Sequence, residues 1–294
     1  MTGLVIQPDG WRRVEPSPSA SELRDFYAAQ YFQNSHGTYA QAYTNDELTH
    51  RRLLASLLVE AIAQGRGVAA GPGDALIEVG CGEGWFLAAA HEAGFAVRGL
   101  DFSADGLTRF NPQFLDHALI GDAFEGLDGL IAAGAAADAV VMEHVLEHVL
   151  DPEALLARLP RLLKPHGVVA ITVPNDFSPL QLEAKALGAI DRDFWVAPPQ
   201  HLNYFNAENL PRFLERMGFE VRVAYASFPI DWFLLHPGSN YVADSAAGKP
   251  AHRARMAIDL LLAERGMDRW LELSKALFAC GAGRSLTVVA GVRP

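Results

Sequence analysis

The chain has 294 residues, of which 50% are hydrophobic, so it can bury a substantial core. Its formal net charge of -11 argues against nucleic acid as a partner, because such a partner needs a basic face. The sequence holds no run of about 18 apolar residues and no signal-peptide pattern, so we expect neither a membrane span nor secretion. Two cysteines, Cys81 and Cys280, are too few for a disulfide framework and indicate a reducing, cytoplasmic location.

Residues 1–45 are predicted to form an arm ahead of the main domain. Prolines and polar residues dominate 1–19, which is typical of a loose or draped segment. A short helix begins near Ser21, and aromatic residues interleaved with turn residues follow it. These aromatic residues either close a lid over a small-molecule pocket or simply dock the arm on the core. The next helix begins at Asn45 and carries an apolar stripe.

A glycine-rich stretch, residues 75–86, is the main indication of a ligand site. An apolar strand pattern ends just before Gly80, and Gly82 and Gly84 follow at alternate positions before a helical pattern. A strand, a sharp turn and a helix N-terminus form the ligand crevice of open α/β sheets. Glycine permits a left-handed backbone and the close approach of a ligand. Asp101 ends the next predicted strand, where a carboxylate suits the two adjacent hydroxyls of a ribose.

The glycine spacing distinguishes two kinds of nucleotide site. An NAD-type oxidoreductase has G-x-G-x-x-G, whereas this loop reads G-x-G-x-G and carries Glu78 and Glu83. Both carboxylates would repel a pyrophosphate at the helix N-terminus, but a ligand with an amino group and a sulfonium would tolerate them. The segment from Glu78 to Gly84 resembles the first motif of the class I S-adenosylmethionine-dependent methyltransferases. The likeness is to the small-molecule type, similar to bacterial polysaccharide and natural-product methyltransferases.

This resemblance implies a Rossmann-like α/β fold with seven mostly parallel strands, the last of which is antiparallel. The methyltransferase core would comprise residues 46–225 and 285–294, with the N-terminal arm as a helical lid. Inside the core we expect a helix over 153–163 and a strand over 168–173. Residues 226–284 are longer than a simple link between the last two strands and contain two helical patterns. We interpret them as a helical cap inserted between strands six and seven, or as a surface that forms a homodimer.

The cofactor implied by the resemblance is S-adenosylmethionine, with contacts on the loops that follow the first four strands. Tyr43 would cap the site, as an aromatic residue ahead of the first core helix often does in relatives. Phe102 would lie against the adenine, whose amino group would donate to Asp122 while the Ala123 amide donates to a ring nitrogen. Asp122 has a second interpretation as a helix cap. The expected cofactor contacts are Tyr43, Glu78, Gly80, Cys81, Gly82, Gly84, Asp101, Phe102, Asp122, Ala123 and Glu143.

The catalytic candidates follow the fourth strand and the fifth. Residues 147–149 and 151–152 match the Glu-His-Val and Asp-Pro of many small-molecule methyltransferases in this class. His144 stands where relatives often have an acid. Methyl transfer is an in-line displacement, and a hydroxyl acceptor benefits from a general base, for which an imidazole is suited near neutral pH. We therefore expect His144 and His201 to be catalytic and His148 to be structural.

Two alternatives accompany this interpretation. His144, Glu147 and His148 would suit a metal ion, as in some relatives, but a clear third carboxylate is lacking and we expect no metal. A cofactor-binding scaffold without turnover is the alternative to an enzyme. We predict an enzyme that methylates a small molecule, by O-methylation of a sugar, a sugar-phosphate derivative or a phenolic metabolite. The aromatic, proline-containing stretch 198–205 would lie with the acceptor at the mouth of the crevice.

Overall fold

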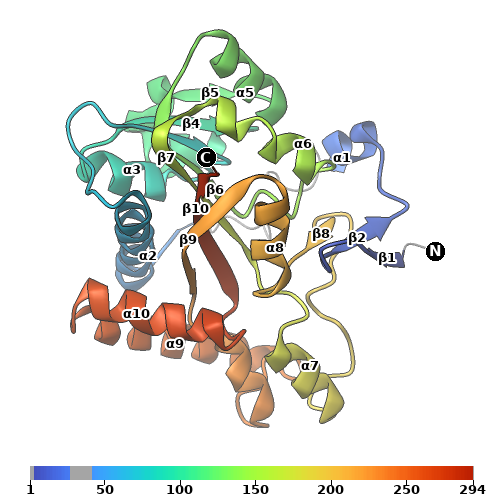
Figure 1. Cartoon of the computed structure of the whole chain (residues 1–294). Helices are drawn as coiled ribbons and strands as arrows, with labels where there is room; N and C mark the ends of the chain where they lie inside the picture. The colour runs from blue at the N-terminus through green and yellow to red at the C-terminus, as the bar shows by residue number, and fades with distance from the viewer. Residues whose placement is uncertain (1–2, 27–41, 294) are drawn as a thin grey trace.

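The structure, a computed structural model, describes residues 3–26 and 42–293 (Figure 1). Its main sheet has seven strands in the order β5-β4-β3-β6-β7-β10-β9. They are β3 (Ala75–Val79), β4 (Ala96–Asp101), β5 (Ala118–Ile120), β6 (Ala137–Glu143), β7 (Leu163–Pro174), β9 (Phe219–Ala226) and β10 (Ser285–Val292). Neighbours pair in parallel from β5 to β7, whereas β10 is antiparallel to both β7 and β9. The predicted Rossmann-like sheet is confirmed. Of the arm predicted as a lid over 1–45, residues 27–41 lie outside the described residues.

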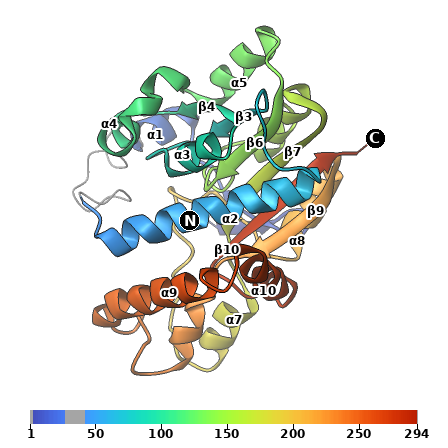
Figure 2. The same cartoon turned by 90° about the vertical axis from the view of Figure 1, so that its left-hand side faces the viewer.

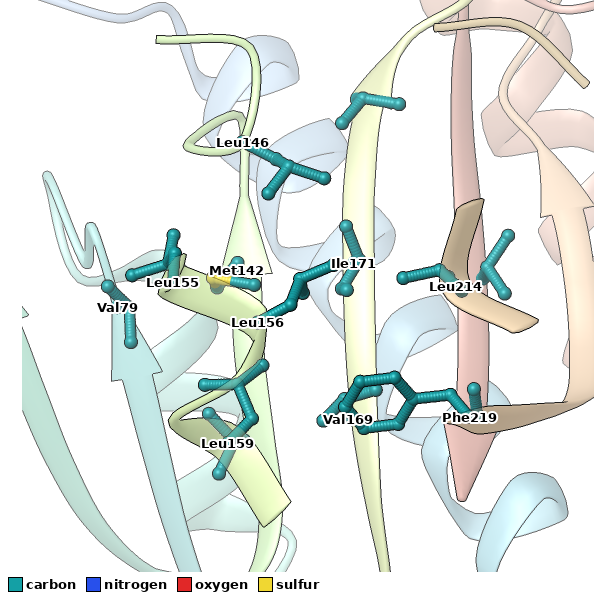
Figure 3. Packing of buried hydrophobic residues seen from close by; sticks show 14 of the residues in the cluster. Val79, Met142, Leu146, Leu155, Leu156, Leu159, Val169, Ile171, Leu214 and Phe219 are labelled. Carbon is teal, nitrogen blue, oxygen red and sulfur yellow. The ribbon is translucent and has the colours of Figure 1, made fainter. Parts of the chain in front are cut away.

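Helices cover both faces of the sheet, because the inner strands carry apolar side chains on both sides. One face packs against α2 (Asn45–Arg66), α3 (Trp85–Glu92) and α10 (Met267–Ala279), and the other against α5 (Ala123–Ala132), α6 (Pro152–Leu156) and α8 (Asn209–Arg216). Figure 3 shows Leu155, Leu156 and Leu159 packed over Met142 and Ile171 of the central strands. In the described part of the chain, every helix is too short or too polar to cross a membrane.

The helix predicted over 153–163 is shorter in the structure. The α6 helix ends at Leu156, and a separate 3₁₀ turn, η3, spans Leu159–Arg161. Pro160 explains the break, because proline has no N–H to donate and disfavours the helical conformation of the preceding residue. The chain then enters β7 at Leu163, earlier than the predicted start of that strand.

The segment predicted to be loose or draped over 1–19 forms a hairpin over residues 3–15 that packs on the rest of the chain. Strands β1 (Gly3–Ile6) and β2 (Arg12–Glu15) form an antiparallel hairpin, and β2 pairs with β8 (Asn203–Tyr204) in a second, three-stranded sheet. Trp11 is buried beside β2, where its ring stacks on Phe205 with the centroids 5.3 Å apart. The hairpin therefore holds the stretch 198–205 in place, because β2 pairs with β8 and Trp11 packs on Phe205.

The insertion 226–284 extends the helical layer that contains α2. Figure 2 shows α9 (Gly248–Ala263) and α10 running beside α2 on the same side of the sheet. A buried pair joins two of these helices, with His50 Nε2 2.8 Å from Asp259 Oδ2. The 3₁₀ helix η4 (Ile230–Leu235) packs instead against α7 (Pro179–Ala186), which follows β7. The other helices described are α1 (Ala20–Phe26), α4 (Asp105–Phe110), η2 (Pro112–His117) and η5 (Ser245–Ala247).

Candidate active site

The glycine loop that follows β3 has a backbone that favours glycine at three positions. Gly80, Gly82 and Gly84 have φ of 76°, 50° and 77°, in the left-handed region. A Cβ on Gly80 would lie 2.4 Å from Val145 Cγ2, so the loop is also packed too closely for a side chain there. The Gly80 amide donates to the carbonyl of Leu100, which fixes the loop to the end of β4. α3 begins directly after the loop, with its first N–H groups at the carboxyl end of the sheet.

Three acids gather around this loop. Asp101 Oδ2 accepts from the Gly82 amide at 2.7 Å, and Asp101 Oδ1 accepts from the Ser103 amide at 3.0 Å. Glu78 is buried, and its Oε2 has no hydrogen-bond partner in the part of the chain that the structure describes. Burial raises the pKa of Glu78 well above its usual range, and the charges of Glu143 and Asp101 raise it further. Such a crevice favours a cationic ligand, because positive charge stabilises crowded carboxylates.

Tyr43 lies against the outer side of the loop, and its contact with the cofactor stays a prediction. Tyr43 donates its hydroxyl to Glu83 Oε1 at 2.6 Å, and Trp85 Nε1 donates to Glu83 Oε2 at 2.6 Å. The guanidinium of Arg51 lies over the Tyr43 ring, 4.0 Å from its centroid. Glu83 is therefore already paired with side chains of the protein. Glu78 Oε2 has no partner among the described residues, and each Asp101 oxygen accepts one amide, which leaves a second lone pair for a ligand.

The residues predicted for the adenine lie at the ends of β4 and β5. Phe102 is exposed, and the Gly121 amide donates to the Asp101 carbonyl, which joins the two strand ends. Asp122 Oδ1 accepts from the amides of residues 124 and 125, so its interpretation as the cap of α5 is confirmed. A contact of Asp122 or Ala123 with adenine stays a prediction.

His144 lies at the end of β6 in a conformation that is rare for histidine. Its φ is 56°, a left-handed value that costs energy for a residue with a Cβ. Its Nδ1 lies 3.0 Å from Glu147 Oε1, and 45% of its side chain is exposed, against 1% for Glu147. Loss of water contacts lowers the pKa of His144, but the hydrogen bond and charge of Glu147 outweigh this, so the pKa is raised.

Glu147 is the buried centre of a histidine cluster. Burial alone would raise its pKa, but His148 and His144 reverse the shift and hold the pKa at about 2. His148 Nδ1 donates to the Gln200 carbonyl at 2.6 Å, and its Nε2 lies 3.8 Å from Glu147. The His201 ring stands 4.9 Å from that of His148, and burial lowers the pKa of His201 to about 4. The structure thus brings both predicted catalytic histidines to one carboxylate.

The same cluster has the spacing of a metal site. One ligand atom from each of Glu147, His148 and His201 lies within 4.8 Å of the other two, so a divalent cation could be held there. Our expectation of a metal-free reaction therefore stays a prediction. The sequence analysis suggested His144, Glu147 and His148 for a metal ion, whereas in the structure His201 takes the place of His144 in this trio.

Two functional candidates were missed by the sequence analysis. Asp176 follows β7 and Arg284 precedes β10, and Arg284 Nη1 donates to Asp176 Oδ1 at 3.1 Å. A polar residue directly beyond a strand end is a signal in both cases. What the sequence does not show is that β7 and β10 are neighbours, which brings these side chains together.

A comparison with known families identifies this arrangement. A family model described as a methyltransferase domain matches residues 18–223, which is more than half of the chain. The chain belongs to this methyltransferase family. Its cofactor is S-adenosylmethionine, whose positive charge suits the acids that gather around the glycine loop.

Curated relatives match part of the methyltransferase. A ubiquinone biosynthesis O-methyltransferase of Caulobacter vibrioides is 32% identical over 146 residues, which are 47% of this chain and 56% of the relative. A probable S-adenosylmethionine-dependent methyltransferase of Mycolicibacterium smegmatis is 29% identical over 148 residues, 50% of this chain and 52% of the relative. The matched region thus spans about half the length of these relatives.

Solved structures share the fold of the methyltransferase. A SAM-dependent methyltransferase from Archaeoglobus fulgidus has a TM-score of 0.51 at 22% identity, with 82% of this chain and 93% of that chain covered. The magnesium protoporphyrin IX methyltransferase from Synechocystis, with bound SAH, has a TM-score of 0.53 at 14% identity, with 94% and 100% covered. At these identities the likeness concerns the fold alone.

Proposed function

We propose that the protein transfers the methyl group of S-adenosylmethionine to a hydroxyl of a small molecule, with His144 as the general base. The observation that carries this proposal is the pair of His144 and buried Glu147 at the end of β6. The acceptor would be a sugar, a sugar-phosphate derivative or a phenolic metabolite. Relatives named as O-methyltransferases of ubiquinone biosynthesis support oxygen as the methylated atom.

The pairing of His144 suits a base. Glu147 is ionised at neutral pH and accepts from His144 Nδ1–H, so this tautomer leaves Nε2 with a free lone pair. When bound, S-adenosylmethionine supplies an electrophilic methyl group, which the acceptor oxygen would attack in line with the departing sulfur of S-adenosylhomocysteine. His144 Nε2 would take the hydroxyl proton as the oxygen–carbon bond forms, and Glu147 would stabilise the resulting imidazolium. The neutral His201 beside them remains the second candidate.

The cofactor contacts of the proposal come from three strand ends. Asp101 would receive the ribose hydroxyls, and Glu78 and Glu143 would face the positive groups of the methionine part. Backbone at Gly80 and Cys81 would lie against the ligand, with Tyr43 covering it. The support is the close-packed left-handed glycine loop and the unpartnered oxygen of Glu78.

The test is release of S-adenosylhomocysteine by the full chain from S-adenosylmethionine, over a panel of sugars, sugar phosphates and phenols. His144→Ala should lower kcat by about a hundredfold while the affinity for S-adenosylhomocysteine stays unchanged. His166→Ala is the matched control, because His166 is also left-handed, with φ of 68°, but lies near the start of β7, the opposite end of the sheet from His144. Wild-type turnover in His144→Ala would contradict the proposal. Assays with and without a chelator separate the base from a metal ion at Glu147.

A further inference from the structure

The region beside the cofactor loops is formed by the ends of β7 and β10. The predicted cofactor contacts follow β3, β4, β5 and β6, so the acceptor must lie toward β7 and β10. Asp176 and Arg284 stand at that place, and the Asn175 amide donates to the Arg284 carbonyl at 2.9 Å. The two charged residues are therefore fixed to each other through backbone as well as side chains.

Arg284 and Asp176 differ in their access to solvent. The Arg284 side chain is 25% exposed, whereas that of Asp176 is 1% exposed. Within residues 3–26 and 42–293 the Arg284 guanidinium makes one hydrogen bond, to Asp176, which leaves further N–H groups for a ligand. Asp176 Oδ2 is buried without a partner in the same described residues. Asp176 thus holds the guanidinium, and Arg284 is the group that a ligand can reach.

The insertion supplies a second acid and an aromatic wall around Arg284. Asp231 of η4 is buried and accepts from Gln181 Nε2 at 3.0 Å and from the Tyr241 hydroxyl. The ring of Tyr241 lies 6.1 Å from that of Phe194, over which Arg284 also lies, at 5.9 Å. Residues 226–284 therefore contribute to the acceptor side of the crevice through η4 and Tyr241.

The charges around Arg284 select against an anion. Asp176 and Asp231 both act on the guanidinium, and Glu147 and Asp231 both act on Asp176. The His144 amide donates to the Thr172 carbonyl of β7, and the Asn175 amide just beyond β7 donates to the Arg284 carbonyl, so His144 and Arg284 lie at the ends of neighbouring strands. Because two buried acids, Asp176 and Asp231, act on this one arginine, a carboxylate or phosphate on the acceptor would meet net repulsion. A neutral oxygen on the acceptor would meet no such repulsion.

We propose that Arg284 is a specificity-determining residue of the acceptor site, donating to an oxygen next to the hydroxyl that His144 deprotonates. The acceptor is then a neutral compound with two adjacent oxygen groups, such as an uncharged vicinal diol. Asp176 is a positioning residue that orients the guanidinium. This inference rests on the proposed function and removes the sugar phosphate from its three acceptor classes.

The experiment compares two isosteric pairs of probes that differ in charge. One pair is 3,4-dihydroxybenzamide and 3,4-dihydroxybenzoate, and the other is glucuronamide and glucuronate. Binding to the full chain saturated with S-adenosylhomocysteine is measured by calorimetry, and turnover with S-adenosylmethionine gives kcat and KM. We expect the amide of one pair to bind at least about tenfold more tightly than its acid. A preference for 3,4-dihydroxybenzamide over its acid would indicate a phenolic acceptor, and a preference for glucuronamide over its acid would indicate a sugar.

Substitutions of Arg284 and Tyr241 test whether these residues determine the affinity for the acceptor. Arg284→Gln should raise KM for the preferred amide by about tenfold or more, with a smaller change in kcat and unchanged affinity for S-adenosylhomocysteine. Arg284→Lys keeps the charge and should restore part of this loss. Tyr241→Phe, which removes one hydrogen bond of Asp231, should raise KM by a smaller factor and serves if Arg284→Gln does not fold. Arg216→Gln is the control, because Arg216 pairs with Asp9 on the α8 surface.

Several results would overturn the inference. The first is that the acids bind as tightly as the amides or more tightly. The second is a wild-type KM in both Arg284 variants. The third is that none of the four probes binds at millimolar concentration although S-adenosylhomocysteine binds. A failure of the proposed function looks different. In that case S-adenosylhomocysteine does not bind, or His144→Ala keeps wild-type turnover.

Discussion

Replacing Glu147 with glutamine keeps the size of the side chain and removes the charge on which His144 depends. The pKa of Glu147 lies at about 2, against an ordinary 4.5. At about 1.4 kcal/mol per pKa unit, this shift corresponds to about 3 kcal/mol of stability at neutral pH. Because the folded-state pKa is depressed, the contribution is present above the ordinary value and is lost as the pH falls toward 2. Glu147→Gln should therefore destabilise the fold by about that amount at neutral pH.

The same substitution should change catalysis in a recognisable way. The raised pKa of His144 predicts that kcat/KM of the wild-type protein rises with pH through a midpoint above the ordinary value for histidine, 6.5. In Glu147→Gln the midpoint should move down, and the plateau should fall by about a hundredfold because the tautomer is no longer fixed. The assays are urea unfolding at neutral pH and a pH–rate profile.

The buried pair of His50 and Asp259 provides the control for loss of a histidine–carboxylate contact. Asp259 is buried and lies 2.8 Å from His50, so Asp259→Asn also breaks a buried histidine–carboxylate pair. It should lose stability but keep the wild-type pH profile. An unchanged midpoint and plateau in Glu147→Gln, with the fold intact, would refute the assignment of His144 and Glu147 as a catalytic pair.

Three further outcomes concern the cofactor and the N-terminal hairpin. Asp101→Ala should weaken binding of S-adenosylmethionine by about tenfold to a hundredfold, measured by calorimetry, since a charged hydrogen bond is lost; unchanged affinity would count against a ribose contact. Because burial raises the pKa of Glu78, its ionised form destabilises the fold at neutral pH, so Glu78→Gln should raise Tm and weaken cofactor binding. A fall in Tm would contradict this. Trp11→Ala should cost about 3 to 5 kcal/mol in urea unfolding, because the ring is buried on Phe205; near-neutral stability would show that the hairpin is dispensable.

The individual strands and the glycine loop were predicted from local patterns, the seven-stranded sheet was implied by the resemblance, and the cofactor contacts stay predictions. Strands β3 and β4 are apolar runs bounded by glycine and aspartate, and the conformations of Gly80, Gly82 and Gly84 are properties of neighbouring residues. The pairing of His144 with Glu147 is also local, since they are three residues apart. Such features depend on short-range sterics and hydrogen bonds, which are visible in a sequence.

Features that depend on distant segments were not predictable in the same way. The β1–β2 hairpin is stable because β2 pairs with residues 203–204 and Trp11 packs on Phe205, both far along the chain. The neighbourhood of Arg284 and Asp176 requires the strand order, which periodicity does not provide. The surroundings of Arg284 and Asp176 were therefore harder to predict from the sequence than the glycine loop.

The small sheet of β1, β2 and β8 makes the beginning of the chain a structural support of its chemistry. Arg13 Nη2 donates to the Leu150 carbonyl, and the Val14 amide donates to the Leu202 carbonyl, on either side of the histidine cluster. Divergence toward new acceptors would then require joint evolution of two stretches nearly two hundred positions apart. Exchanging the loop 198–205 between related enzymes without its matching hairpin should give a chimera with a misplaced His201.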